Sequence, residues 1–184
     1  ALKLGVENLA QKGMQGRGVL VDLFRHYGPG RTLIGHAELM HVLATDGITV
    51  ERGDMLVLRT GYAEAVVAMN GTPDPEVLHT YGAALDGTDD ALLQWITDSG
   101  IAAICADNYA VEAYPAREKS GARPMLPLHH HCLFKLGLPL AELWYLKDLA
   151  EFLFANGRHH FMLTAPPLRL PHAIGSPVTP IATA

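Results

Sequence analysis

The sequence has 184 residues, a hydrophobic share of 49%, a charged share of 18% and a net charge of −5 with neutral histidines. These values are typical of a folded globular protein and exclude a disordered chain. The acidic balance and the scattered lysines and arginines argue against nucleic-acid binding and against a membrane-surface helix. No apolar run approaches the ~20 residues that span a bilayer, so we expect a soluble, cytoplasmic protein.

The chain length is that of one domain with a substantial core, and we treat residues 1–184 as a single domain. Its two cysteines, Cys105 and Cys132, form neither a spaced metal motif nor a disulfide framework. Each lies among apolar residues. We therefore expect both to be buried, reduced side chains.

The first half of the chain alternates helix-like and strand-like segments. Apolar spacing predicts a helix over residues 2–12, and an apolar run bounded by glycines predicts a buried strand over 19–24. A second helix is expected over 35–47 and a second buried strand over 55–59. Residues 60–88 are rich in glycine and proline, and we expect an irregular surface excursion that could cover a pocket.

The second half continues the alternation. A cluster of capping residues precedes a helix over 91–99, and a buried strand follows over 101–106. Residues 141–157 are compatible with one helix, or with a short strand around 142–145 followed by a helix over 147–155. A last strand is expected over 158–164, followed by a tail of loop and edge. Short strand and helix units in alternation predict an α/β fold with strands that are apolar on both faces.

Polar residues follow the strand that ends at residue 106. In α/β sheets the carboxyl ends of the strands are where ligands bind. Asp107, Asn108 and Glu112 could therefore line a substrate pocket. The alternative is that they cap helices or hydrogen-bond within loops.

Three consecutive histidines, His129, His130 and His131, open an apolar segment that Glu142 follows. Imidazole and carboxylate groups are ordinary ligands of zinc or manganese. A short helix over about 128–136 should stop at Gly137, and the turn would let a histidine of its first turn meet the glutamate. The alternative is that the histidines are a polar helix start and Glu142 is a solvated surface charge.

Four segments, taken in order, resemble one known family. They are GRGVLVDL at 16–23, GDMLVLRTGY at 53–62, GIAAICADNYAVE at 100–112, and the run from LHHHCLFKLGLPLAEL to APPLRLPHAIGSPVTPIA. Their order and spacing resemble the cyclase superfamily of metal-dependent hydrolases, which includes kynurenine formamidases and isatin hydrolases. The resemblance implies a swivelling β/β/α domain that lacks its N-terminal strands. It also implies hydrolysis of amide or lactam bonds with one or two metal ions.

The resemblance also implies site residues. In the family, a histidine and a glutamate twelve residues apart form half of the metal site, which here implies His130 and Glu142 as ligands of zinc or manganese. His129 and His131 would support that ligand through hydrogen bonds or serve the structure. Ser176, in Gly-Ser-Pro, resembles the family's closing loop near the active site, and a plain turn is the alternative.

The family's main metal motif, His-x-Gly-Thr-His-x-Asp, does not occur in this sequence. The chain thus resembles about the last two-thirds of a family member, and we expect the first strands and the remaining ligands to lie upstream of Ala1. One expected function is metal-dependent hydrolysis of a small amide or lactam substrate. The other is a non-catalytic cyclase-like remnant or oligomer subunit. Uncovered strand edges favour a homo-oligomer.

Overall fold

The computed structural model of the chain describes residues 2–184, and Ala1 lies outside the described residues. The helices are η1 (Leu2–Leu4), α1 (Val6–Lys12), α2 (Leu23–Tyr27), α3 (His36–Thr45), α4 (Tyr62–Ala68), α5 (Pro75–His79), α6 (Asp90–Ser99), α7 (Pro127–His129), the π-helix η2 (His130–Leu136) and α8 (Lys147–Ala155). The strands are β1 (Gln15–Asp22), β2 (Thr32–Ile34), β3 (Met55–Arg59), β4 (Ala83–Leu85), β5 (Ala103–Ala106), β6 (Leu140–Ala141), β7 (His160–Thr164) and β8 (Ile181–Thr183).

A six-stranded sheet in the order β6-β5-β3-β1-β7-β8 organises the fold, and β2 and β4 form a separate parallel pair. The strands β1, β3, β5 and β6 are parallel, whereas β7 and β8 run antiparallel to their neighbours. All five residues of the central strand β3 are buried, as expected for a parallel strand covered on both faces. The predicted α/β class is confirmed.

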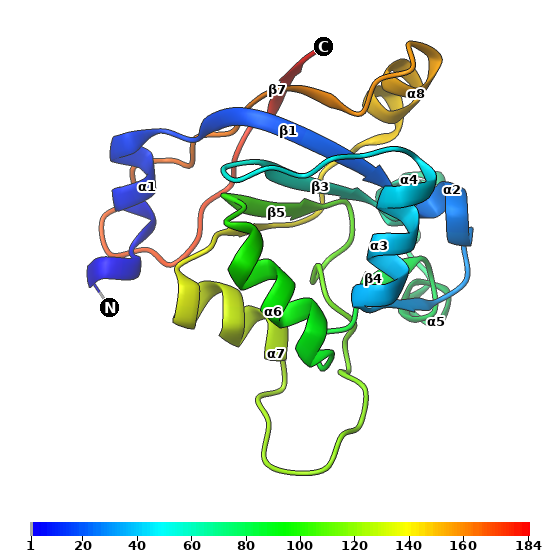
Figure 1. Cartoon of the computed structure of the whole chain (residues 1–184), viewed down its shortest axis with the longest axis horizontal. Helices are drawn as coiled ribbons and strands as arrows, with labels where there is room; N and C mark the ends of the chain where they lie inside the picture. Colours follow the sequence, from blue (N-terminus) through cyan, green and yellow to red (C-terminus); the bar gives the residue numbers. More distant parts are fainter. Residues whose placement is uncertain (1) are drawn as a thin grey trace.

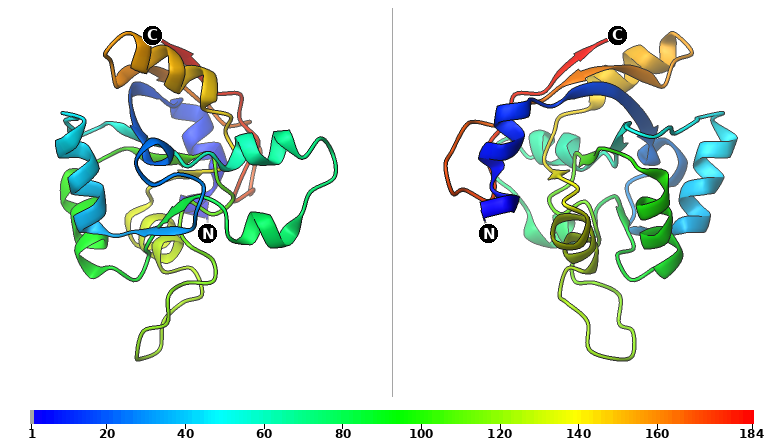
Figure 2. Two further views of the ribbon diagram at one scale, coloured as in Figure 1. Left: turned by 90° about the vertical axis from the view of Figure 1, so that its right-hand side faces the viewer. Right: turned by 60° about the vertical axis from the view of Figure 1, so that its left-hand side comes forward.

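The two faces of the sheet carry two separate apolar clusters. One cluster joins alternate residues of β1, β3 and β5 to helices α3 and α6, and the other joins the intervening residues to α8 and β7. Figures 1 and 2 show α3 and α6 on one side of the sheet and α8 on the other. Cys105 and Cys132 are buried and free, as predicted. No helix among residues 2–184 combines the length and apolar character needed to cross a membrane.

The boundaries of some predicted elements are confirmed and others are wrong: no strand is present over 142–145, and β5 and β7 begin at Ala103 and His160. The strand over 55–59 and the helix over 147–155 are present with those bounds. The expected strand over 19–24 ends at Asp22, because the Asp22 side chain accepts a hydrogen bond from the Arg25 amide and starts α2. The expected irregular excursion over 60–88 contains α4, α5 and β4, so it is built mainly of short regular elements.

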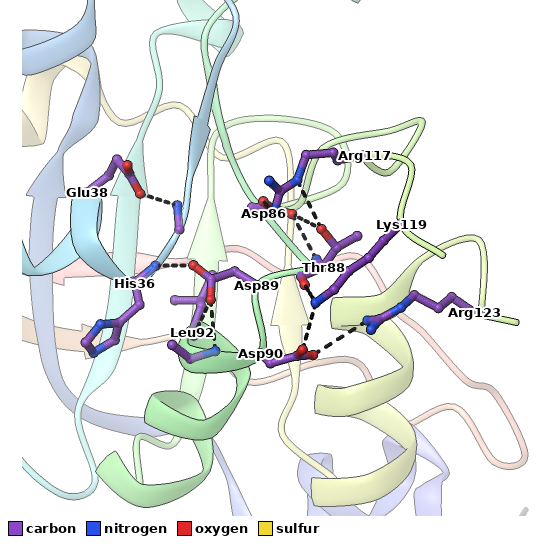
Figure 3. Close-up of polar contacts among 12 residues, drawn as sticks. His36, Glu38, Asp86, Thr88, Asp89, Asp90, Leu92, Arg117, Lys119 and Arg123 are labelled. Carbon is purple, nitrogen blue, oxygen red and sulfur yellow. Dashed lines mark hydrogen bonds and ion pairs between the residues drawn. The ribbon is translucent and has the colours of Figure 1, made fainter. Parts of the chain in front are cut away.

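The longest projecting loop spans residues 113–126 and lies between β5 and α7, at the foot of Figure 1. Three basic side chains tie it to Asp86 and to Asp90, the first residue of α6, as Figure 3 shows. Arg117 contacts Asp86 at 2.6 Å, and both Lys119 and Arg123 contact Asp90, at 2.7 and 3.6 Å. These ion pairs hold the loop to the segment that leads into α6.

The amino end of β3 carries a buried carboxylate whose contribution to stability depends on pH. Asp54 accepts hydrogen bonds from Arg17 Nε and Nη2, both at 2.8 Å, and from the Glu51 amide. Burial alone would raise the pKa of Asp54, but these donors lower it below its ordinary value of 3.8. A lowered carboxyl pKa stabilises the folded state above the ordinary value, and this stabilisation is lost as the pH falls below it.

We therefore expect Asp54→Asn to lower the free energy of unfolding by about 1–3 kcal/mol at pH 7. The difference from the parent protein should shrink as the pH falls below about 4, because Asp54 then becomes protonated in the parent. Urea unfolding of both proteins at several pH values measures this. A penalty of equal size at pH 3 and pH 7 would contradict the assignment.

Candidate functional site

The carboxyl ends of β3 and β5 are joined by Asp107, one of the residues predicted to line a pocket. Its side chain is buried and accepts three hydrogen bonds, from the Thr60 amide at 2.7 Å, the Thr60 hydroxyl at 2.6 Å and the Gly61 amide at 2.8 Å. Burial raises the pKa of Asp107, while the three donors act in the opposite direction. Both carboxylate oxygens are thus engaged in tying two strand ends together.

Asn108 is also engaged within the fold. Its Oδ1 accepts a hydrogen bond from the Val111 amide at 2.9 Å, and its Nδ2 donates to the Ala83 carbonyl at 3.4 Å. Val111 has a φ of 57°, so Asn108 stabilises a turn with a left-handed residue. The contacts of Asp107 and Asn108 are those of the alternative considered from the sequence, hydrogen bonding within the structure.

The histidine run lies on a helical segment that changes its hydrogen-bonding pattern. Pro127 occupies the first turn of α7, and the chain continues from His129 into the π-helix η2. Gly137, with a φ of 68°, ends it, as the sequence predicts. π-helical segments are frequent at functional sites. After η2 the chain continues through β6 to Glu142.

A chain of hydrogen bonds links Glu112, His129 and Glu142. His129 Nδ1 lies 2.8 Å from Glu112 Oε1, and His129 Nε2 lies 3.2 Å from Glu142 Oε1. The side chain of Glu112 is 0% exposed, that of His129 21% and that of Glu142 31%. The hydrogen bonds to Glu112 and then to Glu142 raise the pKa of His129 to about 9. These hydrogen bonds therefore connect a buried carboxylate, Glu112, to a partly exposed one, Glu142.

The structure gives the other two histidines different surroundings. His130, expected from the family spacing to face Glu142, is exposed, and its ring stacks on Phe134 with centroids 5.4 Å apart. His131 Nε2 lies 2.9 Å from the Thr97 hydroxyl on α6. The imidazole beside Glu142 is therefore that of His129, which the sequence had placed among the supporting residues.

The pair of His129 and Glu142 fits two positions around a divalent ion. Two ligand atoms on a tetrahedral zinc ion, each at about 2.0–2.2 Å, lie roughly 3.3–3.5 Å apart. The separation of Nε2 and Oε1 is 3.2 Å, so small side-chain movements would accommodate an ion between them. Among residues 2–184, however, no group of three or more His, Cys, Asp or Glu side chains could hold a metal ion.

A cavity of about 880 Å³ opens beside Glu142. Its wall is mostly apolar and includes Leu9, Phe134, Leu140 and Trp144. Ser176, expected on a closing loop, also lines it, and its hydroxyl accepts a hydrogen bond from the Leu168 amide at 2.8 Å. The structure thus brings Glu142 and Ser176 to one cavity, whereas Asp107 and Asn108 do not line it.

Two residues of this arrangement escaped sequence reasoning in part or in full. Glu112 was considered only as a pocket residue, because nothing local relates it to a histidine 17 positions later. Gly87 was not considered at all, although a Cβ atom there would lie 2.0 Å from Glu112 Oε2. The neighbouring capping residues gave a helix signal, but no pattern marks a glycine that makes room for a distant carboxylate.

The comparison with known protein families finds one match. The Cyclase family model matches residues 3–113. A crystal structure described as a novel cyclase is 34% identical, has a TM-score of 0.81 and aligns over 98% of this chain and 56% of its own. No curated protein sequence gives a significant match.

Two further solved structures share the fold at lower identity. Isatin hydrolase A from Labrenzia aggregata, bound to benzyl benzoate, is 13% identical with a TM-score of 0.68, over 97% of this chain and 64% of its own. A protein described as a potential metal-dependent hydrolase with cyclase activity is 16% identical with a TM-score of 0.60, over 97% and 67%. The chain thus spans between half and two-thirds of the length of these structures.

Proposed function

Because the chain belongs to the cyclase family, we propose that it supplies part of the active site of a metal-dependent hydrolase that cleaves amide or lactam bonds in small molecules. The observation that carries the proposal is the 3.2 Å approach of His129 Nε2 to Glu142 Oε1, and Glu142 of this pair lines the apolar cavity. The two atoms are ligands of the kind that zinc and manganese bind. The isatin hydrolase fold neighbour supports a lactam as one substrate class.

The residues of the chain would have separate roles in the reaction. When bound, a divalent ion would lower the pKa of a water molecule towards neutrality and would polarise the carbonyl group of the substrate. His129 would lose the proton on Nε2 to become a ligand, while Nδ1 keeps its proton towards Glu112. Glu142 would contribute Oε1. The apolar wall around Trp144 would bind the apolar part of a substrate and exclude water from it.

Two protein ligands make a weak metal site. Catalytic zinc sites usually have three protein ligands and one open position. Residues 2–184 offer two converging donor atoms, and the solved relatives are longer than this chain. We therefore propose that further ligands of the complete enzyme come from residues outside this sequence.

We expect calorimetric titration of the protein with Zn²⁺ or Mn²⁺ to show weak, saturable binding of one ion per chain. Glu142→Ala should remove that binding, because it deletes one of two ligand side chains. Glu151→Ala is the matched control, because Glu151 is an exposed glutamate on α8 that pairs with Lys147. Equal binding by the parent protein and by Glu142→Ala would contradict the proposal.

The second candidate function is a non-catalytic oligomer subunit. The observation that favours it is that two carboxylates already satisfy both nitrogens of His129 without a metal. Large apolar side chains also lie exposed around the cavity, with Phe134 at 69%, Leu143 at 61% and Ile174 at 95% exposure. A homo-oligomer could cover them. Sedimentation velocity together with the metal titration separates the two candidates, since this one predicts self-association without metal binding.

A further inference from the structure

The cavity beside Glu142 opens onto one of the two apolar clusters of the core. Five of its lining residues also belong to the cluster around α8, namely Met14, Ala141, Trp144, Ala165 and Val178. Its volume of about 880 Å³ is that of a ligand pocket, and its mostly apolar wall favours an apolar molecule. Such a molecule would extend the packing of the core.

Two segments that are far apart in the sequence form one wall of the cavity. They are α1 and the tail over residues 165–178, which lie side by side in Figures 1 and 2. The Val6 amide donates to the Ala173 carbonyl at 2.9 Å, and the Ala165 amide donates to the Met14 carbonyl at 2.9 Å. These hydrogen bonds lie near the two ends of α1, so they hold this helix in place beside the cavity.

Several polar side chains of the wall already have hydrogen-bonding partners. Glu142 Oε1 lies against His129 Nε2, and the Ser176 hydroxyl both accepts and donates a hydrogen bond within the tail. The Asn8 side chain donates to backbone carbonyls of its own segment. These groups would have to exchange a partner in order to bind a ligand.

Three other groups of the wall have no such partner, and all three are hydrogen-bond donors. The ammonium groups of Lys3 and Lys12 and the indole N–H of Trp144 donate to no acceptor among residues 2–184. In that part of the chain the only occluded polar side-chain atom without a partner is Glu7 Oε2, so the indole N–H is accessible. The groups of the wall that are free to bind a ligand therefore select a hydrogen-bond acceptor.

The two lysines are also not neutralised by a nearby acid. Glu7, the acidic residue of α1, turns towards the tail, where its Oε1 accepts a hydrogen bond from the His172 amide at 3.2 Å. Among the described residues, Glu142 is the one acidic side chain of the wall, and it is paired with His129. The chain as a whole has a net charge of −5, so two unpaired cations at its apolar cavity run against the charge of the protein.

We propose that the cavity binds a small organic anion, an apolar molecule that carries a carboxylate group. The apolar body would pack on Trp144, and the carboxylate would accept charge-assisted hydrogen bonds from the lysines of the N-terminal segment. Because Glu142 would repel a carboxylate beside it, the anionic group would lie on the side of Lys3 and Lys12. The inference requires neither a metal ion nor turnover, so it can be tested separately from the proposed function.

The first test compares three probes that share one apolar body: 4-phenylbutyrate, 4-phenylbutanol and 4-phenylbutylamine. Two-dimensional ¹H–¹⁵N NMR of the metal-free protein follows the indole N–H of Trp144, with that of Trp95 on α6 as an internal control, because Trp95 does not line the cavity. We expect 4-phenylbutyrate to shift the Trp144 resonance alone and to bind about tenfold more tightly than the amine. Added salt should weaken the binding of 4-phenylbutyrate.

Two results of that comparison would overturn the inference. One is an unchanged Trp144 resonance at millimolar 4-phenylbutyrate, which would mean that the cavity does not bind this class of molecule. The other is equal or tighter binding of the alcohol or the amine, which would mean that the wall does not select an anion. A failed Zn²⁺ titration would contradict the proposed function and leave these measurements unaffected.

The second test uses the double variant Lys3→Met and Lys12→Met, which keeps apolar side chains but removes both charges. We expect its affinity for 4-phenylbutyrate to fall by about fivefold or more, while its affinity for 4-phenylbutanol stays within about twofold of the parent value. Lys135→Met is the control, because Lys135 is an exposed lysine of η2 that does not line the cavity. Parent-like binding of 4-phenylbutyrate by the double variant, or an equal loss in Lys135→Met, would overturn the role of the two lysines.

Discussion

Replacing His129 with alanine should lower the affinity for Zn²⁺ by at least about 100-fold, because the loss of a ligand exceeds the 10- to 100-fold effect of losing a residue that only supports one. His129 Nε2 is the imidazole nitrogen beside Glu142, so its removal leaves one carboxylate. The measurement is calorimetric titration of the metal-free protein. The variant should also lose some stability, since Glu112 keeps only its two backbone donors.

His130→Ala is the matched control, one residue along the chain. The His130 ring is exposed and stacks on Phe134, so its removal should leave the affinity within about threefold of the parent value, which is less than about 0.7 kcal/mol. Both proteins need a thermal melt to show that they are folded. If His130→Ala loses Zn²⁺ binding and His129→Ala keeps it, the ligand is His130, as the family spacing implies, and not His129.

This pair of variants marks the limit of what the sequence predicts at the site. Successive residues of a helix point in different directions, so three adjacent histidines face three directions. The sequence locates the segment, its stop at Gly137 and the returning carboxylate Glu142. The His129 ring lies between Glu112 and Glu142, and no local pattern in the sequence relates Glu112 to this histidine.

The fold was more predictable where a segment carries its own signals. The strand Met55–Arg59 opens with four consecutive apolar residues after a tight turn. The helix Asp90–Ser99 is capped by Asp89, whose side chain accepts hydrogen bonds from the amides of Ala91 and Leu92. Such signals act within a few residues. Elements that carry such signals can therefore be predicted without knowledge of the tertiary structure.

The segment over 60–88 was misjudged because its helices are short. The helices α4 and α5 have seven and five residues, too few for an apolar period to emerge. Asp74 and Pro75 do form a start signal, with the Asp74 side chain accepting from two backbone amides. Among the glycines and prolines of this segment, that signal does not distinguish a short helix from the irregular excursion that the sequence predicts. The strand β4 escaped for the same reason, with three residues.

Replacing Asp107 with alanine should lower the free energy of unfolding by about 3–5 kcal/mol, because it leaves three donors without an acceptor in a buried region. For a chain of this size the melting temperature should fall by about 10 °C or more. Urea unfolding followed by circular dichroism measures the free energy, and a calorimetric scan measures the temperature.

Thr60→Val is the graded control for that experiment. It removes the hydroxyl donor at 2.6 Å but keeps the Thr60 amide and the Gly61 amide bonded to the carboxylate, so its cost should be about 1 kcal/mol. A large loss in Asp107→Ala with a small loss in Thr60→Val follows if Asp107 ties β3 to β5. If Asp107→Ala is as stable as the parent, the three hydrogen bonds contribute little to the free energy of unfolding. That result would favour the other interpretation from the sequence, in which Asp107 lines a substrate pocket. The loss of stability in Asp107→Ala therefore decides whether Asp107, at the end of β5, has a structural role or is free to contact a substrate.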